Sequence, residues 1–434
     1  MKILHISATS NGGAANSAIR LHETLLKSGM NSFFLTLENS DKKINNLLHF
    51  DGSVKKYKFD LPPLTLYNWF LEKFSKKFSK EQKLRKLIDE EKNIYTTPNP
   101  TNGEFNFTLF SFPETIYDIT SSSAYRDADI IHLHWVANFI DYPSFFSKID
   151  KPIIWTLHDE NPYLGGFHYQ DDVDRNILSH GLKENEFINL KANCIQKVKD
   201  ITIVSPSEWI ACKARSSTVF NGKRVKTIRY CLDNSIFKPR DKFYSRELFN
   251  LPQNKKIVFV ASQDLSVPRK GVEYVKALIK DPAFDEFLFV FAGNNVHIKK
   301  ENVIAVGSIK DEVLMSCLYS AADFFLLPSI LDNLPNTLLE SLFCGTPVLA
   351  FNIGDFQDIF LAYNFGVLVE KGNLKELKLQ LLLLLLLNGN NLFDNSEIAK
   401  NANIFFSEQK ATEEYFKEYK LLLDSFNNES KSNL

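Results

Sequence analysis

The stretch Pro328–Phe351 reads PSILDNLPNTLLESLFCGTPVLAF, and it places two carboxylates, Asp332 and Glu340, around a turn that opens a helix. The apolar run before Pro328 predicts a strand, and NTLLESLF predicts the helix. The first backbone N–H groups of a helix lack partners within the helix and favour an anion. Amides at 336–338 therefore suit a phosphate, while the carboxylates suit sugar and ribose hydroxyls. An ordinary helix cap beside a surface acid is the alternative.

A separate loop supplies positive charge. SQDLSVPRKGVEYV follows an earlier predicted strand and sets Arg269 and Lys270 at a helix start beside Gly271. Two cations and a helix N-terminus would bind a diphosphate, whereas a solvated surface pair is the plainer interpretation. VGSIKDE, which contains Gly307, follows a later strand and is expected to line the same crevice at the strand ends. Cations, amides and carboxylates together predict a nucleotide-sugar site.

Strand and helix patterns alternate along the chain and restart after a break near residue 235. KILHIS, DIIHLHW, KPIIWTLH and ITIVSPS predict strands before the break, and KKIVFVA, EFLFVFAG, DFFLLP and PVLAF predict strands after it. Apolar strands separated by helices imply parallel sheets covered on both faces. The expected fold is α/β, with two doubly wound, Rossmann-like domains over residues 1–235 and 236–405.

Bulk composition narrows the class of protein. A chain of 434 residues is too long for a single hydrophobic core, so more than one domain is expected. The formal net charge of -1 offers no reason to expect nucleic acid as a partner. Five cysteines without CxxC spacing fit a reducing cytoplasm. MKILHISATS lacks the apolar core of a signal peptide. The longest apolar run, Leu381–Leu387, is too short to span a bilayer, and we expect it in a buried helix.

The segment Asp41–Pro113 interrupts the first domain and contains a predicted amphipathic helix over residues 64–88. Its apolar residues recur every four positions, at Leu66, Phe70, Phe74 and Phe78. Seven Lys or Arg stand against two Glu between positions 72 and 86. Such a helix can lie on an anionic membrane surface, which here means peripheral binding to the inner face of the plasma membrane. A helix packed on its own domain, with a solvated basic face, is the alternative.

Two stretches of the first domain carry further candidate residues. In SATSNGGAANSA, Gly12 and Gly13 let the backbone approach a ligand at a helix N-terminus, although a structural turn fits equally. The stretch is neither GxGxxG nor a P-loop. His158 follows a strand in WTLHDENPYLGGFHY, at the end where doubly wound folds place ligands. The alternative is a structural histidine whose ring is hydrogen-bonded within the protein at the end of the strand.

HLHW sets His132 and His134 on one face of a strand, because alternate residues of a strand share a face. Such spacing also occurs in metal sites. No Asp, His or Glu elsewhere in the sequence completes a convincing ligand set, so we expect no metal.

Together these motifs resemble retaining glycosyltransferases of family 4, whose E-x7-E motif has the shape PSxxExFGxxxxEAxAxGxPVVA. The opening stretch, the RKG at 269–271, the GG after the first strand and His158 all match in order. So does the linker, with Asp233, Phe237 and Pro239. HLHW and WTLHDENPYLGGFHY look like the subgroup that builds bacterial exopolysaccharide and O-antigen repeat units. The resemblance covers nearly the whole chain, apart from 41–113 and the leucine run.

The resemblance implies a GT-B fold, with two domains facing a central cleft. Residues 1–235 would bind the acceptor, 236–405 would bind the nucleotide sugar, and a last helix over 406–434 would cross back to the first domain. Glu340 would bind the ribose, and Asp332 the donor sugar. The implied catalytic residues are His158, Asp332, Arg269 and Lys270. The implied donor-binding residues are Gly12, Gly13, Arg269, Lys270, Gly307, Asp332, Asn336, Thr337, Leu338 and Glu340.

The implied reaction is retaining transfer of a sugar from a UDP- or GDP-sugar to a hydroxyl of a glycan or lipid-linked acceptor, in bacterial surface polysaccharide synthesis. It needs no metal and no cofactor. A nucleotide-sugar epimerase of the same fold, or a non-catalytic nucleotide- or glycan-binding protein, is the alternative. Three positions depart from the family pattern: Asp332 replaces Glu, Cys231 replaces Gly, and IGDFQD at Ile353–Asp358 replaces a Gly-Gly turn.

Overall fold

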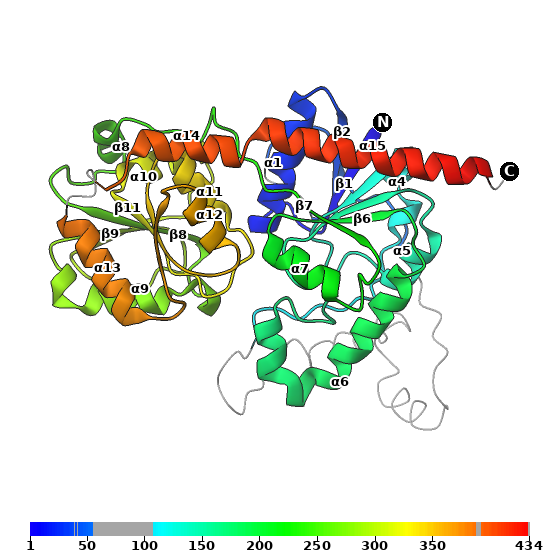
Figure 1. The fold of residues 1–434 in the computed structure, drawn as a ribbon, viewed down its shortest axis with the longest axis horizontal. Helices are drawn as coiled ribbons and strands as arrows, with labels where there is room; N and C mark the ends of the chain where they lie inside the picture. The colour runs from blue at the N-terminus through cyan, green and yellow to red at the C-terminus, as the bar shows by residue number, and fades with distance from the viewer. Residues whose placement is uncertain (39, 41, 55–106, 388–391, 433–434) are drawn as a thin grey trace, which may run out of the picture.

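The computed structural model describes residues 1–38, 40, 42–54, 107–387 and 392–432, which form two α/β domains lying side by side (Figure 1). The first sheet has the order β3-β2-β1-β4-β5-β6-β7, and the second has the order β10-β9-β8-β11-β12-β13. Neighbouring strands in both sheets pair in parallel. The two predicted parallel-sheet domains are therefore confirmed.

The first domain is built from elements on both sides of the undescribed residues. Its strands are β1 (Lys2–Ser7), β2 (Asn31–Thr36), β3 (Leu47–His49), β4 (Ile130–Leu133), β5 (Ile153–Thr156), β6 (Ile201–Ser205) and β7 (Arg224–Thr227). Its α-helices are α1 (Gly13–Lys27), α4 (Ser123–Asp127), α5 (Tyr142–Lys148), α6 (Gln170–Ile195) and α7 (Glu208–Ser216).

The second domain follows the linker. Its strands are β8 (Ile257–Asp264), β9 (Leu288–Asn294), β10 (Val303–Gly307), β11 (Phe324–Leu327), β12 (Val348–Phe351) and β13 (Gly366–Val369). Its α-helices are α8 (Lys242–Leu248), α9 (Val272–Lys280), α10 (Glu312–Ala321), α11 (Asn336–Phe343), α12 (Phe356–Ala362), α13 (Leu374–Leu386) and α14 (Asn395–Phe405), and α15 (Glu408–Ser432) ends the described chain.

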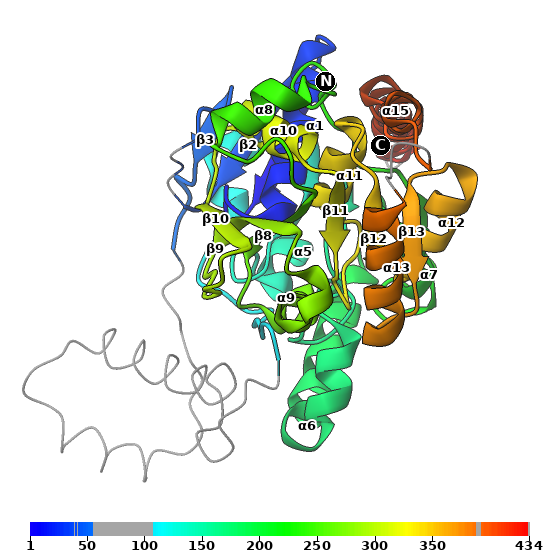
Figure 2. The same cartoon turned by 90° about the vertical axis from the view of Figure 1, so that its left-hand side faces the viewer.

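The order of the strands determines where the loops that carry the candidate site residues lie. In each sheet the strand order reverses beside the first strand of the domain, between β1 and β4 and between β8 and β11. Figure 2 shows β8 between β9 and β11 in the second sheet. Loops that leave two such strands diverge and open a crevice at their carboxyl ends, where doubly wound folds bind ligands. The Gly12–Gly13 turn follows β1, the Arg269–Lys270 loop follows β8, and Asp332 follows β11.

Helix α15 lies across the first domain, beyond α14 of the second (Figure 1). The hydroxyl of Tyr419 lies 2.6 Å from Nδ1 of His132, and the hydroxyl of Tyr415 lies 3.0 Å from Oγ1 of Thr156. Glu418 accepts two hydrogen bonds from Arg224. Buried tyrosines usually find a partner for their hydroxyl, and here β4 and β5 supply it.

Two expectations about atypical segments change. Residues 41–113 are not wholly an interruption, because β3 adds an edge strand to the sheet and Phe110 is 2% exposed in the core. The predicted helix over 64–88 lies outside the described residues. In α13 one face of the leucine run is buried, whereas Leu383 and Leu386 on the other face are exposed. No helix in the described ranges is long and apolar enough to cross a membrane.

Candidate active site

A close backbone approach brings the charged loops of the second domain together. Gly271 has φ of 70°, and a Cβ there would lie 1.9 Å from the carbonyl oxygen of Pro328. Only glycine fits such a contact in the left-handed region. The loop after β8 therefore rests directly on the end of β11, and Arg269 and Lys270 meet Asp332.

Arg269, Lys270 and Asp332 form what we call the cation cluster. Lys270 Nζ donates to Asp332 Oδ2 at 2.6 Å, and Arg269 Nη1 lies 3.3 Å from Oδ1. Burial alone would raise the pKa of Asp332, but the two cations outweigh it and hold that pKa below its usual value. Two cations against one carboxylate leave one net positive charge, which suits an anionic ligand.

Arg269 has contacts beyond the carboxylate. Its guanidinium lies 4.9 Å from the ring centre of Tyr169, a cation–π contact that reaches it from the first domain. Its Nε is buried and has no hydrogen-bond partner within the described part of the chain. A buried donor without a partner is costly, so this N–H is poised to donate a hydrogen bond to a ligand oxygen.

The start of α11 differs in detail from the prediction. Pro335 is the N-cap and makes no side-chain cap, and Asn336 is the first residue of the helix. Its Nδ2 donates instead to the carbonyl of Gly13 at 2.9 Å, and Ser17 Oγ donates to its Oδ1 at 3.0 Å. The amide of Leu338 already donates to Pro335, so the three amides expected to be free at 336–338 are not all available.

The other donor-binding candidates are divided between the contact of the two domains and the edge of the second sheet. Gly12 is the N-cap of α1 with φ of 98°, and a Cβ there would lie 3.3 Å from Gln263 Oε1. Glu340 is 7% exposed and lies on α11. It takes part in a contact between the two domains, and that contact is described below. Gly307 ends β10 at the outer edge of the second sheet, and a Cβ there would meet no atom within 4 Å.

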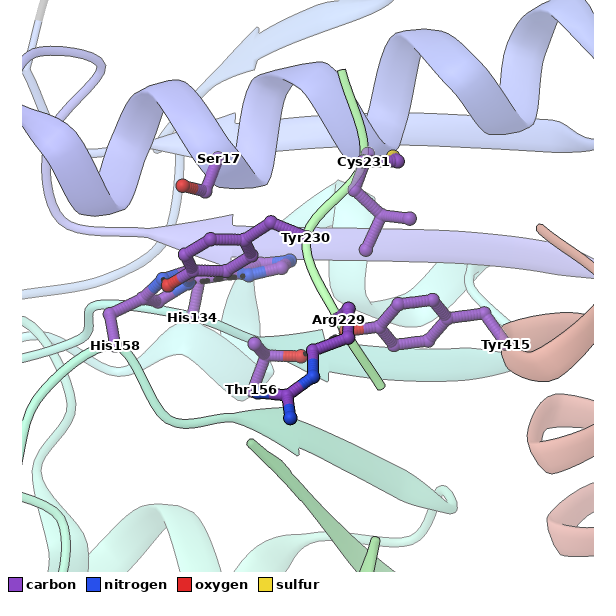
Figure 3. A pocket seen from close by; sticks show the side chains of 9 residues that line it. Ser17, His134, Thr156, His158, Arg229, Tyr230, Cys231 and Tyr415 are labelled. Atoms are coloured by element: carbon purple, nitrogen blue, oxygen red, sulfur yellow. Dashed lines mark hydrogen bonds between the residues drawn. The ribbon is translucent and has the colours of Figure 1, made fainter. Parts of the chain in front are cut away.

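His158 faces a small pocket rather than an open cleft (Figure 3). Its Nε2 lies 3.1 Å from Nδ1 of His134, and its Nδ1 lies 2.6 Å from the hydroxyl of Tyr230. The pocket holds about 10 Å³, barely the space of one water molecule. Burial lowers the pKa of His158 to about 4. In this conformation both ring nitrogens have protein partners, and a substrate would have to displace one of them.

His5, His132 and His134 form the group of described residues that could hold a metal ion, with ligand atoms within 4.8 Å of one another. The rings of His132 and His134 are stacked with centroids 4.2 Å apart. Lone pairs in the planes of stacked rings run side by side. Both nitrogens of His132 and of His134 are already hydrogen-bonded, whereas His5 uses only its Nδ1, and its Nε2 has no partner among the described residues. This geometry favours a buried hydrogen-bond network over a metal centre.

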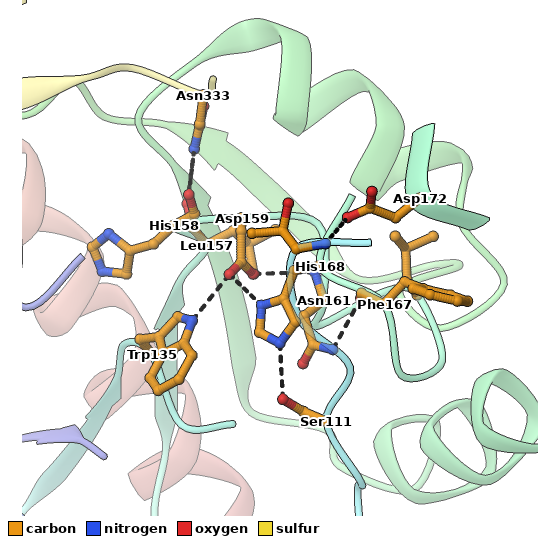
Figure 4. A network of polar contacts seen from close by, with 12 residues as sticks. Ser111, Trp135, Leu157, His158, Asp159, Asn161, Phe167, His168, Asp172 and Asn333 are labelled. Carbon is orange, nitrogen blue, oxygen red and sulfur yellow. Dashed lines mark hydrogen bonds and ion pairs between the residues drawn. The ribbon is translucent and has the colours of Figure 1, made fainter. Parts of the chain in front are cut away.

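The loop after His158 is held by a network that the sequence analysis missed (Figure 4). His168 Nδ1 lies 2.7 Å from Asp159 Oδ2, His168 Nε2 lies 2.9 Å from Ser111 Oγ, and Trp135 Nε1 donates to the same Asp159 oxygen. The connectivity is that of a Ser-His-Asp triad. Ser111 is only 2% exposed, however, so a substrate cannot reach its hydroxyl. The network instead fixes the loop that carries Tyr169.

Asp355, within the IGDFQD departure, joins the two domains. Its carboxylate accepts hydrogen bonds from the amides of Glu208 and Trp209 at 2.6 and 2.7 Å, at the N-terminus of α7 in the first domain. It also pairs with Arg229. A carboxylate at a helix N-terminus is favoured by the free amides and the helix dipole.

We expect Asp355→Ala to loosen the closed arrangement of the domains. The change leaves two amides without a partner at a buried contact, at a cost on the order of 3 kcal/mol. It also takes the carboxylate from Arg229, which keeps its hydrogen bond to the carbonyl of Pro206. Small-angle scattering should report a larger radius of gyration than that of the wild type. Asp358→Asn, an exposed change on the same helix, is the matched control. Equal radii for Asp355→Ala and the wild type would show that Asp355 does not hold the domains together.

Comparison with known proteins adds three observations. Residues 254–386 match the family model described as "Glycosyl transferases group 1". An uncharacterised 41.2 kDa protein in the cps region of Klebsiella pneumoniae is 23% identical over 304 residues, which are 65% of this chain and 76% of that protein. The O-antigen biosynthesis glycosyltransferase WclY of Escherichia coli is 27% identical over 165 residues, which are 35% of this chain and 42% of WclY.

Solved structures share the arrangement of the two domains. Sucrose-phosphate synthase from Thermosynechococcus elongatus superposes with a TM-score of 0.67 at 15% identity, covering 98% of this chain and 99% of that one. Anabaena HepE, solved in complex with UDP-glucose, superposes with a TM-score of 0.59 at 14% identity, covering 97% and 99%. The fold of the chain is GT-B.

Proposed function

We propose that the protein is a retaining glycosyltransferase that moves a sugar from a UDP- or GDP-sugar to a hydroxyl of a glycan or lipid-linked acceptor. Its setting would be bacterial surface polysaccharide synthesis at the cytoplasmic face of the membrane. One observation carries the proposal: the partly buried cation cluster lies beside the N-terminus of α11, at the carboxyl ends of β8 and β11. The cluster falls within the range that matches the family model, and relatives from the cps region and O-antigen synthesis support the setting.

Donor binding would redistribute the contacts of the cation cluster. The diphosphate would take Arg269 and Lys270 from Asp332, since phosphate oxygens accept charge-assisted hydrogen bonds from both. Asp332 would then be free to accept hydrogen bonds from hydroxyls of the donor sugar. The amides that open α11 would face the same phosphates, and Glu340 would accept from the ribose.

The chemistry needs charge stabilisation more than a protein nucleophile. The bond between C1 of the sugar and the diphosphate oxygen breaks through an oxocarbenium-like state, and negative charge collects on the leaving diphosphate. Arg269 and Lys270 are placed to stabilise that charge. The acceptor oxygen bonds to C1 from the same face, and its proton passes to the leaving phosphate oxygen. The configuration at C1 is thereby retained, and no step uses a metal.

A thermal-shift screen against UDP, GDP, ADP and CMP tests the donor site. A ligand that binds only the folded state at 100 times its Kd adds about 2.7 kcal/mol, so one nucleoside diphosphate should raise the unfolding midpoint by a few degrees. Lys270→Met should abolish the shift. Lys276→Met, which removes an exposed lysine of α9, should keep it. No shift with any of the four nucleotides, in a folded sample, would contradict the proposal.

A further inference from the structure

We propose that Arg20 is a positioning residue of the donor site: it holds the carboxylate of Glu340 for the ribose, and it can do so only when the two domains are closed. This inference rests on the proposed function. Arg20 lies on α1 of the first domain, and Glu340 lies on α11 of the second. Glu340, through which the second domain would recognise the ribose, is therefore held in position by a side chain of the first domain.

The guanidinium of Arg20 spreads over three residues of the second domain. Nη2 donates to Oε1 of Glu340 at 2.7 Å, and Nη1 donates to Oδ1 of Asn336 at 3.2 Å. Nε and Nη2 donate to Oε1 of Glu312 at 3.1 and 2.7 Å. The group also lies 5.2 Å from the ring centre of Phe237 in the linker. Its side chain is only 11% exposed, so these contacts are largely shielded from water.

Glu340 is held from both sides. Its Oε1 takes the hydrogen bond from Arg20, and its Oε2 takes one from the hydroxyl of Tyr319 at 2.9 Å. A carboxylate offers about four acceptor positions on two oxygens. One further position on each oxygen therefore stays open, which matches the neighbouring 2′- and 3′-hydroxyls of a ribose. The two donors leave the carboxylate a single orientation.

Arginine is the side chain that this arrangement needs. Burial alone would lower the pKa of Arg20, but Glu340 and Glu312 raise it above its usual value, so the group stays charged. The planar guanidinium can serve two carboxylates and an amide at once, whereas a lysine ammonium is a compact point charge. When the domains separate, Glu340 loses the partner on Oε1. Ribose recognition would thus depend on closure.

The test compares UDP with 2′-deoxy-UDP, or GDP with 2′-deoxy-GDP if the screen selects guanine, by calorimetric titration of the full chain. We expect the wild type to prefer the ribose form about tenfold, as for a lost hydrogen bond to a charged group. Arg20→Met should bring the ratio of the two Kd values close to one. Arg20→Lys should give an intermediate ratio, because lysine keeps the positive charge but lacks the planar set of N–H donors of the guanidinium. Arg224→Met removes another arginine–glutamate pair, away from the cleft, and should keep the wild-type ratio.

The outcomes separate this inference from the proposed function. A wild-type ratio in folded Arg20→Met overturns the inference, and so does tighter binding, which would mean that Arg20 competes with the ribose. If Arg20→Met does not fold, Arg20→Lys decides, and an unchanged ratio again overturns it. A wild type that binds both forms equally overturns the inference and leaves donor binding in place. A wild type that binds no nucleoside diphosphate overturns the proposed function itself.

Discussion

Replacing Lys270 by methionine is expected to slow sugar transfer by two to three orders of magnitude, while the protein stays folded. The ammonium of Lys270 lies 2.6 Å from Asp332 in the structure and would move to the leaving diphosphate in the reaction. Removing one preorganised charge contact to a transition state costs on the order of 3 kcal/mol. Methionine keeps the apolar stem and removes only the charge. The rate is measured as release of nucleoside diphosphate from sugar conjugates of the nucleotide that the screen identifies.

Two further variants give this experiment its meaning. Lys276→Met changes an exposed lysine that pairs with Glu273 on α9, and it should keep the wild-type rate. Lys270→Arg keeps the charge and should recover part of the lost activity. If Lys270→Met retains more than about a tenth of the wild-type rate, the cation cluster does not stabilise a leaving group. A non-catalytic nucleotide-binding protein would then be the better interpretation.

Acidification from pH 7.5 to 5.5 is expected to destabilise the first domain by several kcal/mol. Burial lowers the pKa of five imidazoles, that of His158 to about 4, and the group is His5, His22, His132, His134 and His158. Below an ordinary pKa of about 6.5 the unfolded chain binds protons that the folded one excludes. The contribution of these histidines to the free energy of unfolding is therefore fully present above that pH, and it is lost as the pH falls below it. Each histidine contributes up to about 1.4 kcal/mol per pH unit.

Tryptophan fluorescence isolates this effect, because all four tryptophans precede residue 235, at Trp69, Trp135, Trp155 and Trp209. Urea unfolding followed by this signal should show a lower midpoint at pH 5.5 than at pH 7.5. His5→Leu should reduce the dependence of the unfolding free energy on pH by the contribution of about one bound proton. His297→Gln, an exposed change in the second domain, should leave it unaltered. Equal midpoints at both pH values would show that the imidazoles titrate normally in the folded protein.

The fold and the cation cluster could be predicted because their signals are local. Apolar runs such as VLAF at Val348–Phe351 mark strands buried on both faces, and RKG and PSILDN each follow such a strand. Loops that follow neighbouring parallel strands meet at one edge of the sheet, so Arg269, Lys270 and Asp332 could be assigned to one site before their contacts were known. Strands β2, β3, β7 and β13 were not predicted. With only three residues, β3 is too short to show a period.

What the tertiary structure alone decided is which side chains meet across long separations. Arg20 and Glu340 are 320 positions apart, Glu208 and Asp355 are 147 apart, and Ser111 and His168 are 57 apart. His158 also followed its strand as expected, yet the partners that occupy its ring are His134, just after β4, and Tyr230 of the linker. Periodicity and capping act within a few turns of the chain. The pairing of charges across a domain boundary depends on how two finished surfaces fit, and that fit is set by the packing of whole domains.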